Sequence, residues 1–171
     1  MDYLGPGLIT LSLVVVLVGL VYFGWRNRLK RQQDVAPLPA VPEELSAPVA
    51  AYEGQYVVTT TAGDWLDRLA VHSLGIRSNA LLRVYPQGVL IERRGVQDLY
   101  LPASSISGVR TESGMVGKFV EKDGLAVITW SLGGRDVDTA FRNRQAADKR
   151  PMLEHLKTFV PAVTDNDEDL S

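Results

Sequence analysis

His72 is the one imidazole of the chain that lies near other groups able to do chemistry. It occurs in the stretch "GDWLDRLAVHSLG" together with Asp64, Asp67 and Ser73. Two carboxylates and an imidazole are metal-ligand types, and a serine, a histidine and an aspartate are the groups of a nucleophilic triad. The spacing matches no familiar metal site, and a serine directly after the histidine works against convergence of three side chains. We therefore expect a structural role for His72, with partner contact and metal binding as the alternatives.

The other candidate chemistries fail on residue type or spacing. His155 falls in a predicted helix, away from its apolar face, and reads as a solvated residue. The stretch "SGMVGK" is not a phosphate-binding loop, because Gly114 and Gly117 are too close together and Phe119 follows Lys118. The chain has no cysteine, which excludes disulfides and thiolate chemistry. The sequence therefore predicts no catalytic residue, no metal and no cofactor, and we expect a protein that is not an enzyme.

A long uncharged segment precedes everything else in the chain. No Asp, Glu, Lys, Arg or His occurs from Tyr3 to Trp25. A helix of that length spans the roughly 30 Å hydrocarbon layer of a bilayer. The layout differs from a secretory signal peptide, in which positive charges precede a shorter apolar run. We therefore expect an uncleaved transmembrane helix rather than a signal peptide or a buried core helix.

The charges that flank this segment predict its orientation. Only Asp2 precedes it, whereas four cations follow it at once, and positive charge marks the cytoplasmic side. We expect a single-pass protein of the cell membrane, with the N-terminus outside and the following domain in the cytoplasm. The lipid bilayer is then one partner, and these cations serve orientation and contact with anionic lipid rather than a binding site. They are Arg26, Arg28, Lys30 and Arg31.

Composition divides the chain into four parts. Residues 1–25 contain the predicted span, and residues 26–50 form a basic segment followed by a proline-rich linker that we expect to be a semi-stiff spacer. Residues 51–162 are long enough for one domain with its own core. Residues 163–171 are an acidic tail, predicted to be disordered. The net charge is −2, and no strongly basic stripe is present, so nucleic acid is not an expected partner.

The domain is predicted to be mainly β. Runs of β-branched and aromatic residues are separated by turn residues, and "RDVDTAFR" alternates so that one face should be buried and the other wet. The Gly133-Gly134 pair between the last two runs indicates a two-residue hairpin, and Gly108 indicates a bulge. Trp130 should point into the core. The predicted strands are residues 56–61, 80–85, 89–94, 98–102, 106–112, 125–132 and 135–142.

The period changes after the last strand. Residues 148–160 place their apolar side chains on one helical face, with Asp148 as the expected N-cap and Pro151 in the first turn. About seven short strands followed by one helix predict a strongly bent antiparallel sheet with an open corner that the helix closes. The expected fold class is α+β, mainly β, in the form of a pleckstrin-homology-like (PH-like) barrel.

Three phrases of the sequence carry a resemblance to a known group. "TTTAGDWLDRLAVHSLGIRS", "GMVGKFVEKDGLAVITW" and "VDTAFR" resemble small actinobacterial membrane proteins with one N-terminal span and a PH-like domain. The resemblance covers nearly the whole chain. Its members are often labelled transporter or export proteins, but this span carries no polar residue beyond Thr10 and Ser12 to line a path across the membrane.

The cations of the domain do not form a lipid-headgroup site of the eukaryotic PH type. The segment that would join the first two strands of such a domain offers Arg68 and Arg77 against Asp64 and Asp67, so it has no net charge. The remaining arginines should lie on solvated strand faces beside acids. These are Arg83, Arg93, Arg94, Arg110, Arg142 and Arg144.

The segment "GDWLDRLAVHSLGIRS" remains as the candidate contact surface. It is long for a loop and too apolar for a disordered one. Asp64 could cap a short helix that ends at Gly75 and has Trp65 and Leu69 on one face. Either this segment closes the barrel, or part of its apolar face stays open to dock a protein partner, with Trp65 as the anchor. The candidate docking residues are Trp65, Arg68, Leu69, His72 and Arg77.

Three functions are compatible with these features. The first is a membrane-held PH-like interaction or scaffold module for a protein partner. The second is an accessory single-span subunit of a larger transport or export complex, with the span as the contact. The third is a domain that binds a lipid or a small ligand, or an enzyme of unknown type.

Overall fold

The computed structural model describes residues 11–24, 35–113 and 124–161, and the chain divides into two compact units, Met1–Asp34 and Val35–Ser171. In the first unit, residues 11–24 are helical and every one of these residues is exposed. Within the described residues, no helix combines the length and the apolar character that crossing a bilayer requires. Residues 3–10 and Trp25 of the predicted span lie outside the described residues, as do Arg26, Arg28, Lys30 and Arg31.

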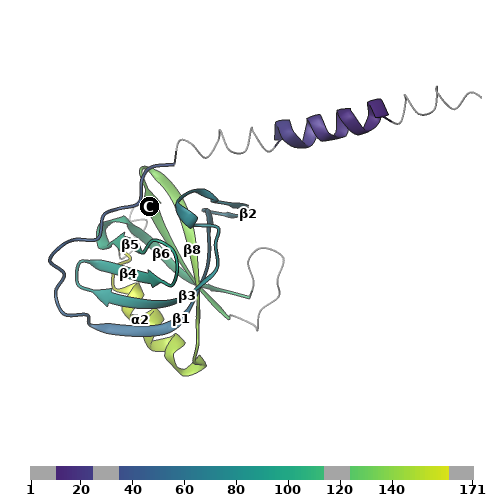
Figure 1. The fold of residues 1–171 in the computed structure, drawn as a ribbon. Coiled ribbons are helices and arrows are strands. Elements are labelled where there is room, and N and C mark those ends of the chain that lie inside the picture. The colour runs from purple at the N-terminus through teal and green to yellow at the C-terminus, as the bar shows by residue number, and fades with distance from the viewer. Residues whose placement is uncertain (1–10, 25–34, 114–123, 162–171) are drawn as a thin grey trace, which may run out of the picture. The chain divides into compact units, whose positions relative to one another are not determined.

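The second unit is built on one antiparallel sheet (Figure 1). Its strands follow the order β5-β4-β3-β1-β8-β7-β6, and β2 pairs with β1 beside this path. The expected mainly β fold with a C-terminal helix is therefore confirmed, with eight strands instead of about seven. The strands are β1 (Ala50–Thr61), β2 (Asp64–Arg68), β3 (Ser78–Tyr85), β4 (Gly88–Arg93), β5 (Leu99–Pro102), β6 (Ile106–Glu112), β7 (Leu125–Leu132) and β8 (Arg135–Asn143).

The turn chemistry of the sequence is realised at the predicted places. The β7–β8 hairpin turns at Gly133 and Gly134, whose φ angles of 59° and 85° suit glycine. The ladder between β6 and β7 shifts register between Ile106 and Gly108, which confirms the predicted bulge. Gly54 in β1 allows a close approach instead of a turn, because a Cβ there would lie 2.2 Å from the backbone oxygen of Arg142. The absence of a side chain at this position lets β1 and β8 cross tightly.

The hydrophobic core fills the inner face of this bent sheet. Trp130 is fully buried, as predicted, and so are Tyr56 and Phe141. Three short one-turn helices connect elements around the core, namely η1 (Val71–Ser73), η2 (Ala103–Ser105) and η3 (Ala146–Asp148). A second, smaller cluster is formed by Val58, Leu125, Val127 and Ala140, so both faces of the sheet carry buried apolar side chains.

The helix α2 (Lys149–Lys157) packs against β1 and β6 and adds Met152 and Leu156 to the core (Figure 1). Asp148 occupies the N-cap position but makes no side-chain capping bond. The prediction for His155 was wrong: the residue is half-buried, and its Nδ1 is 2.6 Å from the hydroxyl of Tyr52 on β1. The helical period places His155 beside β1, where the phenol replaces water as its partner.

The second part of the predicted spacer packs against the domain in the structure, which the sequence analysis did not predict. Val35, Ala36 and Leu38 pack against the core, and Leu45 packs against the cluster of Tyr85, Leu90 and Tyr100. The Val49 amide also donates to the Val84 carbonyl at 2.8 Å. Prolines keep this segment extended, and the apolar residues between them pack against the buried clusters of the domain. Residues 35–49 therefore belong to the packed domain.

Candidate functional site

Residues 64–77, from β2 through η1 to the start of β3, combine exposed and buried apolar side chains, and we call them the β2–η1 segment. Trp65, Leu66 and Ile76 are 47%, 62% and 51% exposed, whereas Leu69 and Leu74 are fully buried. The segment is held to β1 by backbone bonds, since the Thr59 amide donates to Leu74 and the Leu69 amide donates to Thr59. Both interpretations of the sequence thus apply to different residues: part of the segment is core, and part is an open apolar surface.

The predicted short helix in this segment is wrong. Asp64 Oδ1 does accept from the amides of Leu66 and Asp67, at 3.0 and 3.2 Å, which is the hydrogen-bond pattern of an N-cap. The backbone nevertheless continues as β2, because it pairs with Thr60 and Thr61 at the end of β1. Trp65 lies within β2 and stays exposed, whereas Leu69 follows the end of this strand and enters the core.

The remaining predicted docking residues are dispersed by the fold. Arg77 is exposed, and its Nη2 donates to Gln55 Oε1 on β1. Arg68 is half-buried on β2, with its side chain near Gly75. His72 is half-buried and adopts φ 52°, a left-handed conformation that is uncommon outside glycine. Its backbone carbonyl, rather than its imidazole, makes the contact that fixes the loop.

Arg93 makes that contact, and the sequence prediction of a solvated arginine was wrong here. The residue is 3% exposed, and its guanidinium donates to the carbonyls of Gln97, Ser73 and His72 at 2.7, 2.9 and 3.3 Å. It also lies 4.7 Å from the centre of the Tyr56 ring, a cation–π geometry. Strand alternation could have found this role, because Val89 and Ile91 point inward and Arg93 continues the same parity.

A chain of buried hydroxyl groups extends from Tyr56 through the core. The Tyr56 hydroxyl donates to the Leu74 carbonyl at 2.6 Å and lies 2.7 Å from Thr59 Oγ1. Thr59 Oγ1 is 2.8 Å from Thr139 Oγ1, which accepts from Trp130 Nε1 at 2.9 Å. Burial raises the pKa of Tyr56 to about 12, so the phenol stays protonated at neutral pH. The network ties β1, β7 and β8 to the loop that contains η1.

A second polar cluster lies on the other face of β8. Asp138 was predicted to be wet, but its side chain is only 3% exposed. It accepts two bonds from Arg110, at 2.7 and 3.1 Å, and one each from Thr129 and the Gly63 amide. Bonding to four donors explains why a carboxylate can be buried at this position. Arg135 and Asp67 form a neighbouring, more exposed ion pair at 3.1 Å.

Asp138 makes the stability of the fold sensitive to acid. Burial alone would raise the pKa of Asp138, but the bonds from Arg110, Thr129 and Gly63 outweigh burial and lower it below its usual range. A depressed folded-state pKa adds stability that is present above the unfolded pKa and is lost as the pH falls through the folded pKa. Urea unfolding of Asp138→Asn at pH 7 and at pH 2–3 should show a smaller pH dependence than the unsubstituted protein. An unchanged pH dependence would contradict this role.

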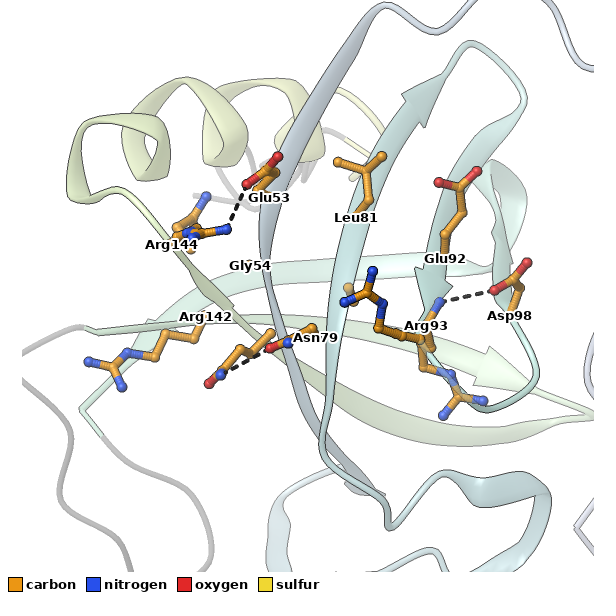
Figure 2. Close-up of a pocket in the computed structure, with 13 residues that line it drawn as sticks. Glu53, Gly54, Asn79, Leu81, Glu92, Arg93, Asp98, Arg142 and Arg144 are labelled. Atoms are coloured by element: carbon orange, nitrogen blue, oxygen red, sulfur yellow. Dashed lines mark hydrogen bonds and ion pairs between the residues drawn. The ribbon is translucent and has the colours of Figure 1, made fainter.

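The outer face of four neighbouring strands is hollowed into a groove of about 810 Å³ (Figure 2). Strand register aligns its side chains in two rows across β8, β1, β3 and β4. The first row carries Arg144, Glu53, Leu81 and Glu92, and the second carries Arg142, Gln55, Asn79 and, next to the end of β4, Arg94. We call the second row the cationic row. Sequence patterns gave no sign of it, because its members come from four separate strands.

Metal binding by His72 and its neighbouring carboxylates finds no support in the part of the chain that the structure describes. No group of three or more His, Cys, Asp or Glu side chains is arranged there to hold a metal ion. Asp67, one of the carboxylates considered with His72, instead accepts from Thr61 at 2.6 Å and pairs with Arg135.

One family of known proteins matches the part of the chain that forms the packed domain. A search of curated proteins gave no match. The family described as bacterial PH domain-like matches residues 35–157. The match starts at Val35, the first residue of the second compact unit, and ends at Lys157, the last residue of α2. It thus covers the packed segment of residues 35–49, the whole sheet and the closing helix, and the chain belongs to the bacterial PH domain-like family.

Proposed function

We propose that this protein is a membrane-anchored PH-like module that holds a protein partner, and that the β2–η1 segment carries the contact. A PH-like domain is typical of an interaction or scaffold module. The observation that carries the proposal is the exposure of Trp65, Leu66 and Ile76 in one short segment of a well-packed domain. Large aromatic side chains of this kind anchor protein interfaces.

The support beneath this segment favours a preorganised contact. Leu69 and Leu74 fix the segment in the core, and Arg93 holds the carbonyls of His72 and Ser73. A surface whose backbone is already fixed loses little conformational entropy on binding. The exposed side chains are therefore presented on a rigid base. We propose a non-catalytic role without a cofactor, and nucleic acid is not among the proposed partners.

The membrane part of the proposal is supported by the sequence. Residues 3–25 carry no charge, and the cluster of cations at residues 26–31 favours a cytoplasmic location of the domain. Tyr3, Tyr22 and Trp25 place aromatic rings near both ends of the segment, which is typical of the two membrane interfaces. The proposed topology has the N-terminus outside the cell and the PH-like domain inside.

Cysteine labelling tests this topology cleanly, because the chain has no cysteine of its own. In intact cells, an impermeant maleimide should label Asp2→Cys and should leave Ser171→Cys unlabelled until the membrane is opened with detergent. The first variant is the matched control for the second. Labelling of Ser171→Cys in intact cells would refute the proposed orientation.

The docking surface is tested by Trp65→Ala. Because Trp65 is half-exposed, the free energy of unfolding should change by less than about 1 kcal/mol, whereas recovery of co-purifying proteins from detergent-solubilised membranes should fall several-fold. Val41→Ala, at an exposed apolar residue outside the segment, is the matched control and should recover partners normally. An unchanged set of co-purifying proteins with Trp65→Ala defeats the docking hypothesis. Loss of partners only when residues 3–25 are exchanged for another span would favour the accessory-subunit function.

A further inference from the structure

The two rows of the groove on the outer face of the sheet differ in how their charges are balanced. In the first row, Arg144 pairs with Glu53 at 3.2 Å, and Glu92 pairs with Arg83 at 3.1 Å (Figure 2 shows the first pair). Asp98, the third carboxylate of the groove, accepts from the backbone amide of Arg93 at 3.0 Å. Each carboxylate that lines the groove therefore already has a donor.

The cationic row has no such balance. Among the described residues, nothing accepts a hydrogen bond from or forms an ion pair with the side chains of Arg94 and Arg142, which stand at its two ends. Between them, Gln55 Nε2 donates to Asn79 Oδ1 at 3.3 Å, and Arg77 donates to Gln55 Oε1, a neutral acceptor. The row and the neighbouring Arg77 thus contribute three guanidinium groups that have no carboxylate partner among the described residues. Arginine stays charged at any physiological pH, so this charge is permanent.

The distance between Arg142 and Arg94 suits a ligand that carries two separate negative charges. The row crosses from β8 through β1 and β3 to the end of β4, and three inter-strand steps separate the Cα atoms of Arg142 and Arg94 by roughly 14 Å. In an extended peptide, residues i and i+4 point to the same side and lie about 13–14 Å apart. The residue at i+2 would stand over Gln55 and Asn79. At the centre of the row, the Asn79 amide group keeps its donors and Gln55 Nε2 keeps one of its two, so neutral donors stand between the two separated cations.

We propose that the cationic row binds an extended acidic segment of a protein partner, with carboxylates at positions i and i+4 paired to Arg142 and Arg94. The guanidinium groups offer forked donors that match carboxylates. The polar centre of the row accommodates a polar residue at i+2. This contact goes beyond the proposed function, since it lies on a different part of β1 from the pairing with β2, and its failure would leave the test of Trp65 unaffected.

The experiment uses the full chain in a neutral detergent and a rhodamine-labelled peptide of alternating serine and aspartate with three aspartates. Fluorescence anisotropy at low salt should show binding that weakens as salt is added. The double variant Arg94→Gln/Arg142→Gln should bind about tenfold more weakly, as expected for the loss of two exposed charge pairs. The single variant Arg94→Gln, at an exposed residue, should bind the peptide about threefold more weakly. It replaces the double variant in the test if the double variant folds poorly.

Controls separate the row from general electrostatic attraction. Arg150→Gln/Lys157→Gln removes the same charge from α2 and should leave the affinity within twofold. An isomeric peptide with three adjacent aspartates should bind more weakly. An equal loss in the α2 variant, equal binding of the two peptides, or no binding at millimolar peptide overturns the proposal. Displacement by inorganic phosphate below 1 mM would assign the row to a phosphate ligand, and tighter binding after removal of residues 162–171 would assign it to the acidic tail of the chain itself. Either result also overturns the assignment to a partner.

Discussion

Replacing Trp130 with alanine is expected to lower the free energy of unfolding by about 3–5 kcal/mol, as large aromatic truncations in cores do. Trp130 is fully buried on β7, opposite Val137 of β8 in the sheet. Its truncation would leave a cavity that the two hydrogen-bonded strands cannot close by moving together. Urea unfolding followed by circular dichroism measures the change.

Two further variants separate the contributions at this position. Trp130→Phe keeps most of the ring volume but removes the Nε1 donor to Thr139, which should cost about 1 kcal/mol for the hydrogen bond. Trp65→Ala removes the same side chain type from an exposed position and should cost less than about 1 kcal/mol. A Trp130→Ala protein as stable as Trp65→Ala would contradict the placement of Trp130 in the core.

The strands that local sequence could predict are those whose pattern does not depend on distant partners. The bounds predicted for residues 106–112 and 125–132 are those of β6 and β7. Alternation, β-branched residues and the Gly133-Gly134 turn act within a few residues, so the sequence carries them directly. The burial of Trp130 followed from the same alternation.

β2 shows where local information ends. The hydrogen bonds of Asp64 to Leu66 and Asp67 are those of a helix start, so the local signal was real. It was outweighed by pairing with Thr60 and Thr61 of β1, a contact that the sequence pattern does not reveal. The predicted docking set was split for the same reason, because Leu69 turned into the core while Trp65 stayed outside.

The cationic row shows a different limit. Arg94 and Arg142 are far apart in the sequence, and the sequence interpretation placed both on solvated faces beside acids. Register decides which arginine meets a carboxylate: Arg144 lies across from Glu53, whereas Arg142 lies across from Gln55. A shift of two residues in the pairing of β1 with β8 would place Arg142, in place of Arg144, across from Glu53. The unbalanced charge is therefore a property of the sheet and not of any local stretch.

Replacing Arg93 with alanine is the second change with a large expected effect, and it should lower the free energy of unfolding by about 3–5 kcal/mol because several buried acceptors lose their donor. The guanidinium is the hydrogen-bond donor to carbonyls of Gln97, Ser73 and His72, and its loss would leave these acceptors without that donor in a nearly closed site. Ser73 and His72 both hold positive φ angles, 57° and 52°, and such backbone persists only when its surroundings fix it. Arg93→Ala should therefore also loosen the loop that contains η1.

The neighbouring residue provides the matched control for this effect. Arg94 is exposed, and Arg94→Ala removes the same side chain one residue along the chain, so it should change stability by less than about 0.5 kcal/mol. Hydrogen exchange distinguishes a global loss of stability from local opening of the loop. In Arg93→Ala, the amides of Leu74 and Ile76 should lose more protection than the drop in overall stability explains, because both donate to carbonyls within this loop. If Arg93→Ala and Arg94→Ala unfold at the same urea concentration, Arg93 does not fix the loop. If Arg93→Ala is destabilised but the loop amides follow the global change, the rigid base proposed beneath Trp65 rests on Leu69 and Leu74 alone.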